Sequence, residues 1–102
     1  MNIDHVKIRR ESIRWATMLA LDKARPTPVA GEVILGTLRG IYPDATQLEC
    51  HRELDYLEER GLVAIQTFPN GLLAASLTRL GIDVVEYTVD CDPGIARPVK
   101  YW

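Results

Sequence analysis

Few residues in this sequence have the types and spacing that chemistry at an active site requires. The two histidines, His5 and His51, lie far apart. Cys50 and His51 are adjacent on a predicted helix, where their side chains point about 100° apart and cannot chelate together. Asp90-Cys91-Asp92 could join a metal site only with distant ligands, so a solvated acidic turn before Pro93 is the simpler interpretation. We find no glycine-rich phosphate loop. The sequence therefore predicts no catalytic site, no metal site and no cofactor.

The residues best suited to bind a macromolecule lie at the start of a predicted helix over 46–62. Gln47 and Arg52 have the side chains that pair with adenine and guanine, and His51 lies on the same outer face. A second set near the N-terminus is basic and could contact phosphates; a solvated helix start is the alternative interpretation. It consists of Lys7, Arg9, Arg10 and Arg14.

The same helix also carries features that disfavour DNA. It contains five acidic residues against Arg52 and Arg60, and DNA repels such a face. Leu48, Arg52 and Tyr56 recur at helical spacing on the outer face, as the anchors of a protein interface do. An isolated exposed Leu or Tyr also occurs without any role. The sequence leaves DNA contact, a protein interface and no contact open for this face.

Size and composition set the broad class. A chain of 102 residues with 47% hydrophobic and 25% charged residues is expected to form one globular domain without a covalent staple. No apolar run approaches the roughly 20 residues of a membrane span. The two cysteines, Cys50 and Cys91, are placed too differently to predict a disulfide, and the N-terminus is polar. We therefore expect a cytoplasmic protein that has no membrane contact.

The helix over 46–62 is the element that positions the candidate site. Thr46 is a good N-cap with Glu49 three residues later, and Gly61 is a typical stop. Cys50, Leu54 and Leu57 form its apolar stripe, which we expect to be buried.

Two helices are predicted before this element. The first runs from about Ser12 to Arg25, and the second from Pro28 to about Arg39 with Thr27 as its cap. Val29, Val33, Ile34 and Leu38 are expected to face inward. Gly36 interrupts the second helix, and close approach of a neighbouring helix would explain it.

A hairpin and a last helix follow. Strands are predicted over 62–68 and 72–77, joined by Asn70-Gly71 at a tight turn. Thr78 caps the last helix, and proline and glycine keep the tail extended. Ile95, Val99, Tyr101 and Trp102 are too apolar for a free tail, so they should cover their own domain or a second copy.

Two local segments resemble winged-helix proteins. They are RELDYLEERGLV (52–63) and LTRLG (77–81), which are similar to the corresponding parts of MarR-, PadR- and ArsR-like bacterial regulators. More narrowly, these segments together with ARP (24–26) and the tail resemble a small protein of Mu-like prophages. The resemblance implies an α+β winged helix-turn-helix with three helices, a two-stranded wing, a C-terminal helix and a phage setting. We therefore expect a winged-helix domain over residues 1–88 and an extended C-terminal tail over residues 89–102, packed on the domain or on a partner.

Two functions follow from this reading. The first is a small DNA-binding and transcription-regulatory protein that acts as a homodimer on double-stranded DNA. The second is an interaction or assembly module that binds a phage or host protein and not DNA, with Leu48, Tyr56, Tyr101 and Trp102 at the interface. No enzyme activity is expected.

Overall fold

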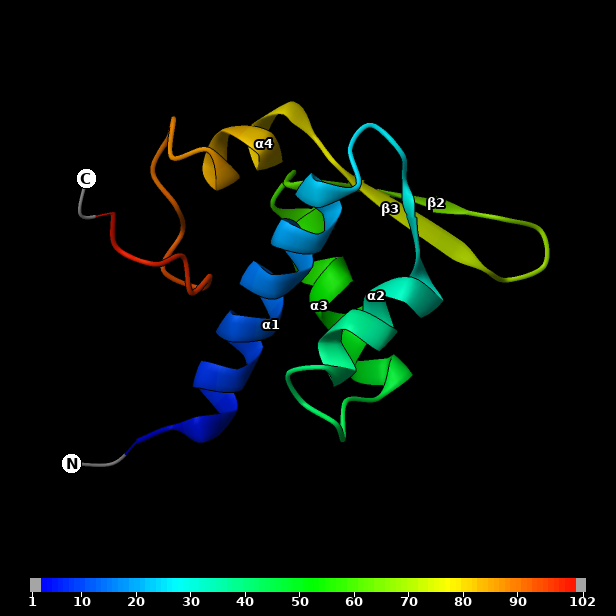
Figure 1. Cartoon of the computed structure of the whole chain (residues 1–102), viewed down its shortest axis with the longest axis horizontal. Coiled ribbons are helices and arrows are strands. Elements are labelled where there is room, and N and C mark those ends of the chain that lie inside the picture. Colours follow the sequence, from blue (N-terminus) through cyan, green and yellow to red (C-terminus); the bar gives the residue numbers. More distant parts are fainter. Residues whose placement is uncertain (1–2, 101–102) are drawn as a thin grey trace.

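The computed structural model describes residues 3–100, which form an α+β domain with four helices and a small three-stranded antiparallel sheet. Figure 1 shows the first three helices packed together, with a hairpin projecting on one side. The elements in chain order are α1 (His5–Lys23), β1 (Val29–Ala30), α2 (Gly31–Arg39), α3 (Gln47–Glu59), β2 (Val63–Thr67), β3 (Leu73–Leu77) and α4 (Arg79–Val85).

Side-chain caps fix the starts of three helices. Thr46 and Thr78 accept hydrogen bonds from the backbone N–H groups of Glu49 and Gly81, as the sequence predicts. The start predicted for the first helix is wrong, because Asp4 accepts a hydrogen bond from Lys7 N and begins α1 at His5. Lys7, Arg9 and Arg10 therefore lie within α1 and not before its start.

The predicted start of the second helix is also wrong. Val29 and Ala30 pair with Ala75 and Ala74 of β3, so they form a strand, and α2 begins after them without a side-chain cap. On α2, Ile34 and Leu38 are buried as predicted, but the inward position predicted for Val33 is wrong. Its side chain points about 100° away from that of Ile34 and is 58% exposed. The two strands predicted as a hairpin are therefore part of a three-stranded sheet with the order β1-β3-β2.

The hairpin of β2 and β3 forms as predicted. Val63 lies opposite Leu77 and Thr67 opposite Leu73, with no break in the register. Gly71 has a φ of 83°, a conformation that glycine adopts without strain. Asn70 accepts a hydrogen bond from Leu72 N and closes the turn.

The core lies between α1, α2, α3 and the sheet. The stripe on α3 is buried as predicted, since Cys50, Leu54 and Leu57 are at most 2% exposed. The proposed reason for Gly36 is wrong, because a Cβ at this position would meet nothing within 4 Å. The fully buried apolar side chains from the other elements include Ile13, Met18, Leu21, Ile34 and Leu38.

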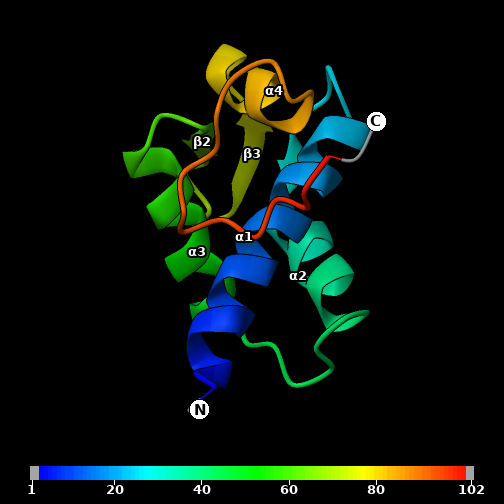
Figure 2. The same cartoon turned by 90° about the vertical axis from the view of Figure 1, so that its left-hand side faces the viewer.

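The segment after α4 packs on its own domain. It crosses α1 in Figure 2, where Ala96 N donates to Glu11 O and Ile95 is only 5% exposed. The Arg97 guanidinium donates to Val84 O and Val89 O, which ties the segment to the end of α4. Val99 is 67% exposed, so it does not share this cover. Tyr101 and Trp102 lie outside the described residues.

Candidate functional site

Helix α3 presents most of the predicted contact residues to solvent. Gln47, Leu48 and Arg52 are exposed, and His51 and Tyr56 are half-buried. Leu48 is 68% exposed, the largest exposed fraction among the large apolar side chains of residues 3–100. The predicted outer face is therefore present, with its apolar and polar residues side by side.

Glu53 on the same helix is buried, which the sequence reading missed. It is 1% exposed, and Arg14 Nε donates to its Oε1 at 2.9 Å. Arg14 Nη1 also donates to Gly94 O, so one guanidinium joins α1, α3 and the C-terminal segment. The Arg14 side chain is 13% exposed, and its donors serve the fold rather than a phosphate.

Tyr56 packs against the same Arg14 guanidinium. The Arg14 Cζ lies 3.5 Å and the Arg60 Cζ 3.9 Å from the centroid of its ring. Two guanidinium groups cannot share one ring face at these distances, so they lie on opposite faces, where the ring attracts both cations. Arg60 also pairs with Asp92 at 3.5 Å. Tyr56, predicted as an interface residue, therefore also packs α3 against the segment after α4.

Arg9 is held by two carboxylates. Its Nε and Nη2 donate to Glu49 at 2.7 and 2.8 Å, and its Nη1 donates to Asp44 at 3.0 Å. The hydrogen bonds from Arg9 hold the pKa values of Glu49 and Asp44 below their ordinary values. Arg9 and Arg14 therefore bind α1 to the first two turns of α3. Neither has the free guanidinium that a phosphate contact requires.

This cluster predicts a pH dependence of stability. A carboxylate with a lowered pKa in the folded state stabilises the fold above its unfolded pKa, and the effect disappears as the pH falls through the folded value. We expect Arg9→Met to lower the free energy of unfolding at neutral pH. This deficit should shrink on acidification below about pH 4.5, the ordinary pKa of a glutamate. Chemical denaturation between about pH 3 and pH 7 measures this deficit, because that range includes the ordinary pKa values of both Asp and Glu.

The matched control is Arg10→Met on the same helix. Arg10 is exposed and makes no ion pair within residues 3–100. Its replacement should change stability little at any pH. A deficit of Arg9→Met that stays constant down to pH 3 would contradict the role given to Glu49 and Asp44.

Three of the predicted cations stay unpaired. The side chains of Lys7, Arg10 and Arg52 are exposed and take part in no ion pair between residues 3 and 100. Of these, only Arg52 lies on α3. Asp55, Glu58 and Glu59 are exposed further along the same helix. The outer face of α3 therefore has one free cation at its start and three acids toward its end.

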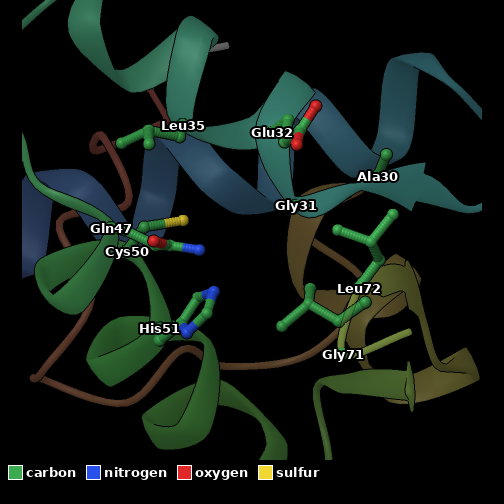
Figure 3. Close-up of a pocket in the computed structure, with 10 residues that line it drawn as sticks. Ala30, Gly31, Glu32, Leu35, Gln47, Cys50, His51, Gly71 and Leu72 are labelled. Carbon is green, nitrogen blue, oxygen red and sulfur yellow. The ribbon is translucent and has the colours of Figure 1, made fainter. Parts of the chain in front are cut away.

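A groove separates α3 from the hairpin. It is a hollow of about 100 Å³ lined mainly by apolar groups, including Leu35, Leu72 and Leu73. Figure 3 shows Gln47 and His51 of α3 on one side and Leu72 of the hairpin on the other. Glu32 at the start of α2 is the charged carboxylate of its lining. We call this hollow the α3–hairpin groove.

The titratable side chains that line the groove are those of Glu32, Cys50 and His51. Burial raises the pKa of the Cys50 thiol to about 11, so the thiol is neutral and a poor nucleophile or metal ligand at neutral pH. No cluster of three or more His, Cys, Asp or Glu side chains suited to a metal occurs in the described part of the chain. The hairpin adds no charge, because residues 61–78 contain no Asp, Glu, Lys or Arg. Phe68 and Leu72 are 41% and 51% exposed there.

Comparisons with known proteins add no assignment to this geometry. Among the helices of residues 3–100, none combines the length and apolarity needed to cross a membrane. No model of a known protein family matches the chain, and the search of curated proteins returns no match either.

Proposed function

We propose that this chain is a winged-helix domain that recognises a protein through α3 and the hairpin. The fold proposal is supported by the chain order. Helix α2 leads through a short turn into α3, and α3 passes directly into the β2–β3 hairpin, as a recognition helix passes into a wing. The strand β1, which pairs beside β3, fits the same arrangement. In such a domain α3 and the hairpin together form the recognition surface.

The charge and the exposed apolar side chains of α3 and the hairpin support recognition of a protein. Three large apolar side chains are exposed on α3 and the hairpin: Leu48 on the outer face of α3 (68%), Leu72 in the α3–hairpin groove (51%) and Phe68 on the hairpin (41%). Exposed apolar groups of this kind gain free energy when a partner covers them, by about 25 cal/mol for each Å². The acids at the end of α3 favour a partner that carries Lys or Arg beside its apolar residues. The expected partner is therefore a basic and apolar polypeptide segment.

The charge distribution opposes DNA as the main ligand. Protein–DNA binding draws most of its affinity from Lys and Arg that replace counterions at phosphates. Arg9 and Arg14 are engaged with Glu49 and Glu53, and the hairpin carries no cation. Arg52 is the one unpaired cation on α3 within the described residues.

DNA binding is the second candidate function. Gln47, His51 and Arg52 lie exposed or half-exposed on the first two turns of α3, the part of a recognition helix that reaches base edges. Lys7 and Arg10 on α1 would then supply the phosphate contacts.

Titration of labelled duplex DNA separates the two functions. We expect no saturable change in fluorescence anisotropy at micromolar protein and low salt. Binding that weakens as salt rises and disappears in Arg52→Ala would contradict the protein-recognition function, because the salt dependence reports phosphate contacts. Glu58→Ala removes an acid from the same helix and serves as the matched control for folding.

Photochemical crosslinking tests the protein function directly. A photoreactive residue in place of Leu48 should attach to one polypeptide whose crosslinked segment contains Lys or Arg, whereas the same residue in place of Lys23 at the end of α1 should not. Leu72→Ser should reduce the adduct about tenfold, because half of a buried leucine side chain corresponds to about 1.4 kcal/mol. If the photoreactive residue at position 48 gave the same adduct yield with and without Leu72→Ser, the result would argue against binding in the groove.

A further inference from the structure

The buried stripe of α1 continues beyond the core. Ile13, Thr17 and Leu21 recur every four residues and are at most 1% exposed. Val6 lies on the same stripe, because the seven residues between it and Ile13 are close to two turns of an α-helix, yet its side chain is 60% exposed. In Figure 1 the first turns of α1 point away from α2 and α3. Val6 is therefore in line with the core but is not covered by it.

Two cations lie beside Val6 on this stripe. Lys7 and Arg10 are exposed and make no ion pair within residues 3–100. Residues 3, 6, 7 and 10 have the spacing that places side chains on one side of a helix. Ile3, just before the helix, is 59% exposed. We call these four residues the α1 start face, which is both basic and apolar.

The outer face of α3 has the complementary chemistry. It contains an open hollow of about 410 Å³, whose lining includes Leu48, Tyr56, Asp55 and Glu59. Leu48 is 68% exposed at the start of the helix. Asp55 and Glu59 are exposed further along and take part in no ion pair between residues 3 and 100. This face therefore offers apolar surface and free carboxylates.

We propose that the α1 start face of each chain docks on the outer face of α3 of a second copy. This inference rests on the proposed function, in which α3 recognises a basic and apolar polypeptide segment, and it names that segment. A two-fold axis across the middle of α3 sets the two α3 helices antiparallel and forms both contacts at once. Lys7 and Arg10 then approach Asp55 and Glu59 of the second copy, and Val6 covers apolar surface in its hollow.

Charge complementarity favours a second copy in this arrangement. The two faces adjoin on one chain, because Arg14 of α1 lines the same hollow and Arg10 lies one turn before it. A two-fold contact requires a surface that is complementary to itself, and here a basic end and an acidic end lie side by side. Contact between two α1 start faces would instead oppose like charges. A partner of another kind could satisfy one end, whereas a second copy satisfies both.

An exchange of charges tests the proposal. We expect sedimentation equilibrium of the parent chain to show a mass that doubles as its concentration rises. Lys7→Glu/Arg10→Glu and Asp55→Lys/Glu59→Lys should each be monomeric, because each double variant opposes like charges in both contacts. An equal mixture of the two variants should form heterodimers, since each contact again joins opposite charges. Acids at the start of α1 and a cation at the end of α3 suit the helix dipoles, so both variants should keep the parent circular dichroism spectrum.

A pair of serine substitutions tests the apolar part of the contact. Val6→Ser should raise the dissociation constant of the dimer by about tenfold or more, because the two-fold contact buries this side chain twice. Ile8→Ser is the matched control. Ile8 is 51% exposed, but its side chain points about 200° away from that of Val6 around the helix. Its replacement should leave the dissociation constant unchanged, and equal weakening by both substitutions would contradict the face assigned to α1.

The outcomes separate this inference from the proposed function. A parent chain that is monomeric at all concentrations, or folded charge variants that do not associate when mixed, would overturn the second copy as the partner. The photoreactive residue at position 48 reports on the function itself. An adduct between a monomeric chain and a different basic polypeptide would overturn the inference and leave the function in place. An adduct between two copies, attached within residues 3–10, would support both.

Discussion

Replacement of Arg14 by methionine is expected to lower the free energy of unfolding by about 3–5 kcal/mol. The substitution leaves the buried carboxylate of Glu53 without a counter-charge, because the side chain of Glu53 is 2% exposed and its ion-pair partner is the guanidinium of Arg14. A carboxylate deprived of its partner in such a place retains the desolvation penalty and loses the attraction that offset it. The variant also loses the hydrogen bond to Gly94 O and the contact with the Tyr56 ring. Urea denaturation of the full chain measures the effect.

The double variant Arg14→Met/Glu53→Leu is the control. It removes both charges and fills similar volume with apolar atoms, a change that is often neutral or stabilising for buried pairs. We expect it to recover most of the stability that Arg14→Met loses. If Arg14→Met were destabilised by less than about 1 kcal/mol, the pair would behave as a surface ion pair. That result would contradict the burial on which the expectation depends.

Replacement of Gly81 by alanine is expected to destabilise the domain by about 3 kcal/mol or more, because it introduces a severe overlap. A Cβ at this position would overlap the backbone carbonyl oxygen of Leu62. This carbonyl cannot move freely, since it accepts the hydrogen bond from Thr78 N that joins β2 to the start of α4. Relief of the overlap therefore requires that α4 move away from the sheet. Thermal denaturation followed by circular dichroism measures the loss.

The same substitution at Gly36 should have the opposite sign. Gly36 is an exposed residue inside α2, and a Cβ there would meet nothing within 4 Å. Alanine has the higher helix propensity, so Gly36→Ala should stabilise the domain by about 0.5–1 kcal/mol. If Gly81→Ala and Gly36→Ala were destabilised to the same extent, the cause would be the loss of glycine itself and not an overlap of the Cβ of residue 81 with Leu62 O.

The parts of the fold that could be predicted from the sequence depend on local signals. Thr46 and Thr78 cap helices through residues three positions away, and Asn70-Gly71 closes a hairpin through its own backbone. The stripe on α3 follows from helical periodicity. Strand β1 gave no such signal, because two residues have no measurable period and their partners in β3 lie more than 40 residues further along the chain.

The roles of the basic residues depended on long-range pairing. Arg9 and Arg14 reach carboxylates that follow them by 40 and 39 positions, so charge counted along the chain could not show these ion pairs. A usable signal was nonetheless present. Arg9 and Arg14 are five residues apart on one helix, and their partners Glu49 and Glu53 are four residues apart on another. Complementary spacing of this kind predicts two helices packed side by side.

The pairing of Arg14 with Glu53 also restricts how this sequence can change over generations. A small domain is stable by only about 5–15 kcal/mol, so loss of one buried charge removes a large share of that margin. A lineage that replaces Arg14 first would pass through a form near the limit of folding, and the same holds for Glu53. The two positions should therefore covary among descendants, with both charges kept or both lost, although 38 residues separate them along the chain.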